Sequence, residues 1–141
     1  MIGILIITHG SLGESLLSCA KHVIGREPEQ LAFLAVSNFD DPNGLFPEAQ
    51  VMVKSLNTGD GVLVLSDMYG ATPCNTVGKL LQPGVVEGVA GVNLPMLVRS
   101  ITYRHESLLT LVEKAVSGGR EGVVHFSKET CDRYEQGVSK S

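Results

Sequence analysis

The chain has 141 residues and a mass of 15.0 kDa, which is the size of one ordinary domain with a hydrophobic core. Its hydrophobic content of 43% and charged content of 18% exclude an intrinsically disordered chain. The formal net charge of -4 argues against nucleic-acid binding, because no basic surface is available to neutralise phosphates.

The cysteines and the first apolar run bear on the cellular compartment. Three widely spaced cysteines, none of them in a C-x-x-C pair, indicate free thiols in a reducing compartment and give no zinc site. The run from Ile2 to Ile7 has no basic flank and no cleavage site, and it is far shorter than the roughly 20 residues that span a bilayer. We therefore expect a cytoplasmic protein.

Apolar runs of strand length alternate along the chain with stretches of helical period. In chain order the predicted elements are a strand at 3–7, a helix at 16–24, a strand at 31–36, a helix at 45–56, a strand at 62–65, a helix opening at Thr72-Pro73, a strand at 85–90, a helix at 108–116 ended by Gly118-Gly119, and a short fifth strand at 122–126. Thr72 suits the N-cap of its helix, and Pro73 suits the first turn.

This alternation predicts a doubly wound α/β fold, a parallel sheet with helices on both faces. For a chain of this size we expect the strand order 2-1-3-4. Ligands in such folds bind at the carboxyl ends of the strands, where the strand order reverses direction. Strands one and three are neighbours at that point, so Thr8-His9-Gly10 and Ser66-Asp67-Met68 should meet there.

His9 and Asp67 are the candidate catalytic pair. A carboxylate that accepts a hydrogen bond from one ring nitrogen fixes the histidine tautomer and leaves the other nitrogen free to attack. We predict that His9 is a nucleophile toward phosphorus and that Asp67 orients it and stabilises the charge it gains. A structural histidine at a strand end is the competing interpretation. The other histidines, His22, His105 and His125, are poorly placed for this chemistry.

Each member of this pair is followed by a glycine-containing turn that leads into a helix. Exposed N–H groups at helix N-termini attract anions, although an ordinary strand-to-helix turn would explain either loop alone. The predicted phosphate-binding residues are Gly10, Ser11, Gly70, Ala71 and Thr72. Because no set of metal ligands surrounds His9, we expect no metal and no cofactor.

Four motifs resemble the mannose-type enzyme IIA domain of the bacterial phosphoenolpyruvate-dependent sugar phosphotransferase system. In chain order they are IITHG at 6–10, SDMYGATPCN at 66–75, GVNLPML at 91–97 and GREG at 119–122. The resemblance runs over about residues 1–127, so we expect that span to form the enzyme IIA domain and residues 128–141 to form a polar C-terminal tail.

The resemblance implies a phosphoryl carrier, a phosphotransferase component that works through a phosphohistidine. In that family the histidine matching His9 takes phosphate from the phosphocarrier HPr and gives it to an enzyme IIB, here a separate protein or a regulatory partner. The aspartate matching Asp67 hydrogen-bonds that histidine. The resemblance also implies a homodimer that exchanges an antiparallel last strand, and at most peripheral membrane association through a permease complex. The chain departs from the family at Cys74, where phenylalanine is common, and at Arg99, near which an acidic residue is frequent.

Three other functions compete with this one. A receiver phosphorylated on Asp67 would need an acidic cluster after strand one to hold Mg²⁺, and that position reads Thr8-His9. The phosphodonor subunit of a dihydroxyacetone kinase has a related domain, but its usual motif has serine where Gly10 stands. A non-catalytic module that binds a phosphorylated metabolite through two helix N-termini stays open.

Overall fold

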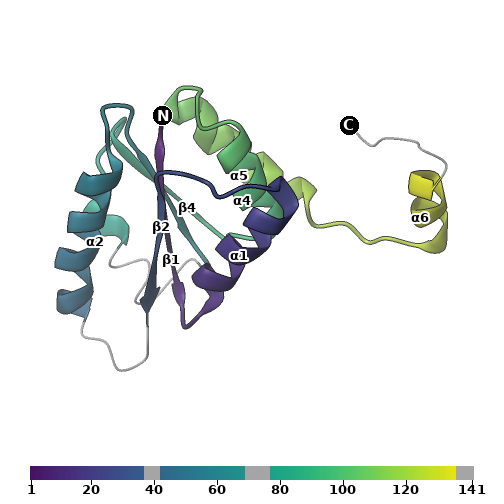
Figure 1. Cartoon of the computed structure of the whole chain (residues 1–141), viewed down its shortest axis with the longest axis horizontal. Helices are drawn as coiled ribbons and strands as arrows, with labels where there is room; N and C mark the ends of the chain where they lie inside the picture. Colours follow the sequence, from purple (N-terminus) through teal and green to yellow (C-terminus); the bar gives the residue numbers. More distant parts are fainter. Residues whose placement is uncertain (37–41, 69–76, 136–141) are drawn as a thin grey trace.

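The computed structural model describes residues 1–36, 42–68 and 77–135. Within these ranges a single sheet lies between helices on its two faces, and a C-terminal extension stands away from this body (Figure 1). The start of the helix expected from Thr72-Pro73 onward, with the candidate residues Gly70 and Ala71 before it, lies outside the described residues, whereas residues 77–80 are helical.

The sheet is parallel and has the order β2-β1-β3-β4, which confirms the predicted topology. Its strands are β1 (Gly3–His9), β2 (Leu31–Val36), β3 (Val62–Ser66) and β4 (Val86–Ala90). Strand β1 runs two residues further than predicted, because Thr8 pairs with Ala35 and His9 pairs with Val36. The longer strand brings His9 to the carboxyl end of the sheet.

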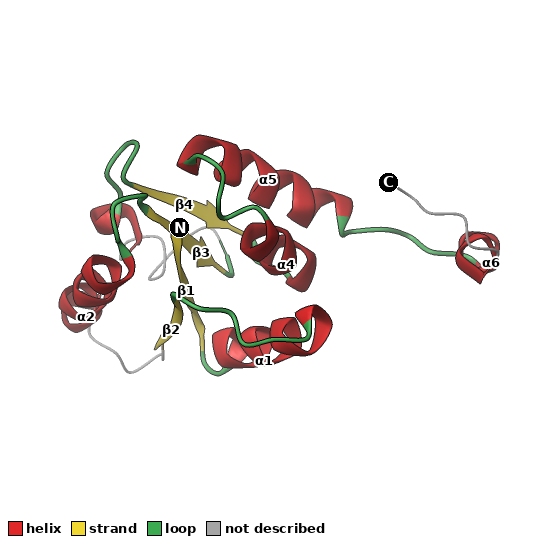
Figure 2. Ribbon diagram, turned by 45° about the horizontal axis from the view of Figure 1, so that its top comes forward, coloured by secondary structure: helices red, strands yellow, loops and turns green. Residues whose placement is uncertain are grey.

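Alternate residues of the buried strands feed two separate cores. In β1, Ile4 and Ile6 pack under α1 (Leu12–Ile24), α4 (Leu94–Thr102) and α5 (Leu108–Glu121), while Leu5 and Ile7 pack under α2 (Pro42–Leu56). Figure 2 shows the corresponding layers, with α2 on one side of the sheet and α1, α4 and α5 on the opposite side. No helix in the described part of the chain is both long and apolar enough to cross a membrane.

Helix α4 was missed by the sequence prediction. It begins after Asn93, whose side chain accepts a hydrogen bond from the Met96 N–H, and Pro95 occupies its first turn. Its buried residues Leu97 and Ile101 join the core on that face of the sheet. The N-cap and the proline are signals of a helix start that the sequence carried.

The predicted end of the last long helix at Gly118-Gly119 is wrong, since α5 continues to Glu121. Both glycines are buried against α4, and a Cβ built on Gly119 would lie 2.6 Å from the Met96 side chain. A Cβ on Gly118 would lie 2.9 Å from Arg99. The glycines therefore allow two helices to approach closely, and that packing outweighs their poor helix propensity.

Beyond α5 the chain forms an exposed arm, residues 122–127, which leads to α6 (Lys128–Glu135). The segment predicted as a fifth strand is not a strand in the single chain. Val123 and Phe126 are 77% and 74% exposed, which is unusual for large apolar side chains. In Figure 1 the arm carries α6 away from the sheet. Pairing of this segment with a second subunit stays a prediction.

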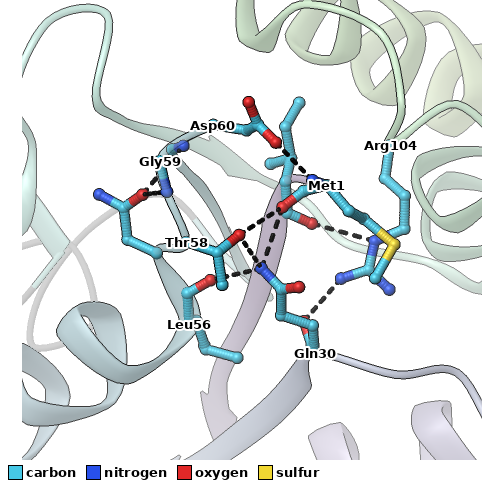
Figure 3. Close-up of polar contacts among 10 residues, drawn as sticks. Met1, Gln30, Leu56, Thr58, Gly59, Asp60 and Arg104 are labelled. Atoms are coloured by element: carbon cyan, nitrogen blue, oxygen red, sulfur yellow. Dashed lines mark hydrogen bonds and ion pairs between the residues drawn. The ribbon is translucent and has the colours of Figure 1, made fainter.

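A polar cluster joins several segments at the amino end of the sheet (Figure 3), whereas His9 lies at the other end of β1. The buried Arg104 donates to the carbonyl oxygens of Ile2, Glu29 and Gln30. Burial, together with the smaller effect of the Arg26 charge, lowers the pKa of this guanidinium to about 10, although the charge of Glu29 acts in the opposite direction. These bonds fix the start of β1 against the chain entering β2.

Candidate active site

The structure brings the two predicted catalytic side chains together. His9 ends β1, and Asp67 directly follows β3, the neighbouring strand. The His9 ring nitrogen Nδ1 lies 2.9 Å from Asp67 Oδ2. Two residues separated by 58 positions in sequence thus meet at the point where the strand order reverses.

The Asp67 carboxylate is held by more than the histidine ring. Its Oδ2 also accepts a hydrogen bond from the backbone N–H of His9 at 3.0 Å, and its Oδ1 accepts from the N–H of Met68 at 3.0 Å. Burial alone would raise the pKa of Asp67, but these hydrogen bonds and the attraction of the His9 ring together lower the pKa below its usual value. The carboxylate is therefore ionised at neutral pH.

Ionisation of Asp67 decides which nitrogen of His9 is reactive. An ionised carboxylate can only accept hydrogen bonds, so Nδ1 of His9 must carry the proton that lies between them. In the neutral ring, the lone pair then belongs to Nε2. The His9 side chain is 41% exposed while that of Asp67 is 11% exposed. A second molecule can therefore reach the imidazole ring of His9 more readily than the Asp67 carboxylate.

The loop between His9 and α1 is closed by two hydrogen bonds. Gly10, at φ 53°, donates its N–H to the Val36 carbonyl at 2.9 Å, and Gly13 donates its N–H to Thr8 Oγ1 at 2.7 Å. Among the described residues no group accepts from the N–H of Ser11 or of Leu12. The Ser11 side chain makes no capping hydrogen bond either. Within the described part of this loop, the N–H groups of Ser11 and Leu12 are thus available to an anion beside His9.

This geometry refines the predicted phosphate-binding set. Gly10 contributes a left-handed backbone conformation to the loop, since its own N–H already has an acceptor. Ser11 keeps both a free N–H and an uncommitted hydroxyl among the described residues. Gly70, Ala71 and Thr72 lie outside the described residues, as does Cys74. Sequence reasoning missed Thr8, whose signal is a hydroxyl residue at the end of an apolar run.

The remaining sequence candidates lie elsewhere or have other partners. His22, His105 and His125 are all exposed, and none of them is hydrogen-bonded to a carboxylate within the described ranges. Arg99 pairs with Glu121 at 2.7 Å, which links α4 to the end of α5. Within residues 1–36, 42–68 and 77–135, no three His, Cys, Asp or Glu side chains form a group that could hold a metal ion.

The described residues form an open α/β protein in which an aspartate orients a histidine at the point where the strand order reverses. Comparison with protein families identifies the family within this fold class. The family model EIIA-man, described as the fructose IIA component of the phosphotransferase system, matches residues 3–116. The chain belongs to this mannose-type enzyme IIA family of the phosphotransferase system.

Relatives and solved structures agree with that assignment. The chain is 35% identical over 125 residues to the mannose-specific EIIAB component of Escherichia coli K12, a match covering 86% of this chain and 38% of that protein. The chain therefore spans well under half the length of this relative.

The fold is also that of known enzyme IIA structures. A component EIIA from Streptococcus agalactiae is 27% identical with a TM-score of 0.79, and the match covers 89% of this chain and 98% of that one. The mannose/sorbose-specific IIA subunit from Enterococcus faecalis has the same fold at 23% identity and a TM-score of 0.80, with 89% and 95% covered.

Proposed function

We propose that this chain is a cytoplasmic phosphoryl carrier that accepts phosphate from HPr on Nε2 of His9. It then passes the phosphate to an enzyme IIB or to a regulatory partner. The observation that carries the proposal is the 2.9 Å contact between His9 Nδ1 and the ionised Asp67 carboxylate. That contact leaves Nε2 as the nucleophile on an exposed ring.

The reaction is an exchange of one phosphorus–nitrogen bond for another. Nε2 of His9 forms a bond to phosphorus while the bond to the donor imidazole breaks, and the electron pair leaves with the donor. The His9 ring becomes more positive as it attacks, and the Asp67 carboxylate at Nδ1 stabilises that charge. In-line transfer of this kind depends mainly on how the two imidazoles and the phosphoryl group are positioned, and it needs little covalent catalysis beyond the attacking nitrogen.

The backbone after His9 supports the transferred group. Charge in a loose phosphoryl transition state lies on the equatorial oxygens, which accept hydrogen bonds from N–H donors. The N–H groups of Ser11 and Leu12 stand at the N-terminus of α1, where the helix dipole also favours an anion. We propose that Gly70, Ala71 and Thr72 supply the matching donors from the second loop.

A chemical test separates the carrier from a non-catalytic module that binds a phosphorylated metabolite. The protein is incubated with enzyme I, HPr and labelled phosphoenolpyruvate, and the isolated chain is then treated with acid or base. We expect covalent label that is lost in acid and retained in base, as a phosphohistidine requires. Absence of covalent label, combined with reversible binding of phosphorylated metabolites, would favour the binding module.

We further propose that the chain forms a homodimer by exchanging the arm. The arm exposes Val123 and Phe126, and β4 has no second strand neighbour among the described residues. An open strand edge and an exposed apolar segment are complementary, because pairing them satisfies backbone groups and buries apolar surface. The arm leaves α5 at Gly122, which lies next to Pro95, since a Cβ on Gly122 would be 2.5 Å from that side chain. Pro95 comes shortly after Ala90, the last residue of β4, so the arm starts near the end of that strand.

Light scattering at micromolar concentration should give a mass of twice 15.0 kDa for the intact protein. The double variant Val123→Asp and Phe126→Asp should shift the mass toward that of the monomer, because two charges would enter the apolar contact. As a control, Val51→Asp changes another exposed apolar residue, which lies on α2 and away from the arm. An intact protein of monomeric mass would contradict the exchange.

A further inference from the structure

Thr8 is a buried polar side chain directly beside the candidate nucleophile. It is fully buried, in a strand whose other inner residues are aliphatic. A buried hydroxyl is unfavourable unless it is hydrogen-bonded. Its Oγ1 accepts the N–H of Gly13 at 2.7 Å, which is a short bond for a nitrogen donor. The side chain thus joins β1 to the first turn of α1.

The contact between Thr8 and Gly13 is so close that a Cβ at position 13 would force the neighbouring atoms to move. A Cβ built on Gly13 would lie 2.9 Å from Thr8 Oγ1 and 3.3 Å from Ile6 Cγ2. The first turn of α1 therefore rests directly on β1. Ser11 occupies the usual capping position of α1, yet its side chain makes no capping bond, and Thr8 satisfies a helix N–H instead.

The hydrogen bond from the Gly13 N–H to Thr8 Oγ1 closes a short loop that contains His9. Thr8 and Gly13 lie on either side of His9, and the Gly10 N–H is bound to Val36 in the neighbouring strand. The two bonds anchor the loop at both ends. The N–H groups of Ser11 and Leu12, which have no acceptor among the described residues, stand between these anchors. Their positions relative to the His9 ring therefore depend on the Thr8 hydroxyl.

We propose that Thr8 is a positioning residue for phosphoryl transfer: its Oγ1 holds the first turn of α1 so that the Ser11 and Leu12 N–H groups meet the phosphoryl oxygens on His9. The proposal rests on the phosphohistidine function proposed above. A simple capping role predicts lower stability with unchanged transfer. A positioning role predicts slower transfer beyond what lost stability explains, because small displacements at a reacting centre lower the rate strongly.

Three variants distinguish these roles. Thr8→Val keeps the shape and removes the acceptor, while Thr8→Ser keeps the hydroxyl. The matched control is Ser107→Ala, which removes a hydroxyl that accepts from the Thr110 N–H at the start of α5. That helix start follows Arg104, which is bonded to Ile2 at the opposite end of the sheet from His9. All three proteins are assayed with purified phospho-HPr well below their unfolding temperatures.

We expect Thr8→Val to lower the transfer rate at least fivefold, Thr8→Ser to remain within twofold of wild type, and Ser107→Ala to transfer normally. Phosphorylation of wild type should also shift the amide NMR signals of Ser11 and Leu12 downfield, and Thr8→Val should reduce those shifts. Normal transfer by Thr8→Val, or equal losses in Thr8→Val and Thr8→Ser, would overturn the proposal.

A second variant covers the case in which Thr8→Val does not fold. Gly13→Ala places a methyl group against Thr8 Oγ1 and pushes α1 away from β1, so it should also slow transfer at least fivefold. Wild-type transfer by a folded Gly13→Ala protein would overturn the proposal. Failure of the proposed function itself gives a different result, since wild type would then carry no label on His9 whatever stands at position 8.

Discussion

His9→Ala is expected to abolish phosphorylation by phospho-HPr. The variant lacks the ring whose Nε2 forms the new bond to phosphorus, and no other described histidine has a carboxylate hydrogen-bonded to it. Removal of the attacking atom leaves no alternative nucleophile in the same position, so the loss should be complete and not merely large. The measurement is incorporation of label from phosphoenolpyruvate through enzyme I and HPr.

The other histidines provide matched controls for that loss. His22→Ala, His105→Ala and His125→Ala each remove one exposed imidazole while leaving the His9–Asp67 pair intact. All three variants should be labelled to the wild-type extent. Label retained on His9→Ala, or lost from any one of the controls, would show that the phosphorylation site has been assigned to the wrong residue.

Asp67→Asn should slow transfer at least tenfold while the protein still folds. The amide has nearly the same shape, but its NH₂ group can donate to Nδ1 of His9 and so favour the tautomer with the proton on Nε2. That tautomer has no lone pair at the attacking nitrogen, an effect that carboxylate-to-amide changes produce in other histidine sites. The amide would also fail to stabilise the charge that the ring gains. Single-turnover transfer from phospho-HPr measures the effect.

Stability against pH gives Asp67→Asn an independent readout. The folded pKa of Asp67 is below its unfolded value, so the ionised carboxylate stabilises the fold above the unfolded pKa. This contribution is lost as the pH falls through the folded pKa. The difference in unfolding free energy between wild type and Asp67→Asn should therefore be present at neutral pH and shrink in acid.

Asp60→Asn is the matched control for Asp67→Asn. Asp60 is also a carboxylate paired with a nitrogen, the N-terminal amine of Met1, but it lies at the amino end of the sheet (Figure 3). The substitution removes the same charge from the chain without touching His9. Transfer by Asp60→Asn should match wild type. Normal transfer by Asp67→Asn would exclude Asp67 from the mechanism.

The topology and the position of the site were predictable because they follow from local patterns. Apolar runs such as Leu31–Val36 give the strands, and parallel order brings the residues after strands one and three together. His9 and Asp67 could be paired on that basis alone. Their roles in catalysis stay predictions, as do the donors expected from Gly70 to Thr72.

The end of α5 was misplaced because packing between helices decides it. Gly118-Gly119 has the local signature of a helix end, but close contact with α4 keeps both glycines inside α5. Helix α4 was missed for a different reason: Asn93 and Pro95 signal its start, but its 9 residues are too few to show a clear helical period. Local propensity alone does not reveal which glycine is required by a neighbouring helix.

The fine structure of the site was also beyond sequence reasoning. The Gly10 N–H looked available to phosphate, but the register of β1 against β2 places the Val36 carbonyl within reach of it. The bond from Gly13 to Thr8 depends equally on how closely α1 lies on β1. Such bonds join groups whose proximity only the assembled sheet determines.

The position of the arm has a consequence for the order of biosynthesis. Among the described residues, the four strands and the helices that cover them all precede residue 122, so the arm is synthesised after every element of the body. Domains generally fold as units during synthesis, and the two cores need no residue from the arm. Folding of the body is then a first-order event within one chain, whereas the exchange of arms that we propose would be a bimolecular step. The rate of that proposed exchange would rise with the concentration of folded chains, so assembly would depend on protein concentration although folding would not.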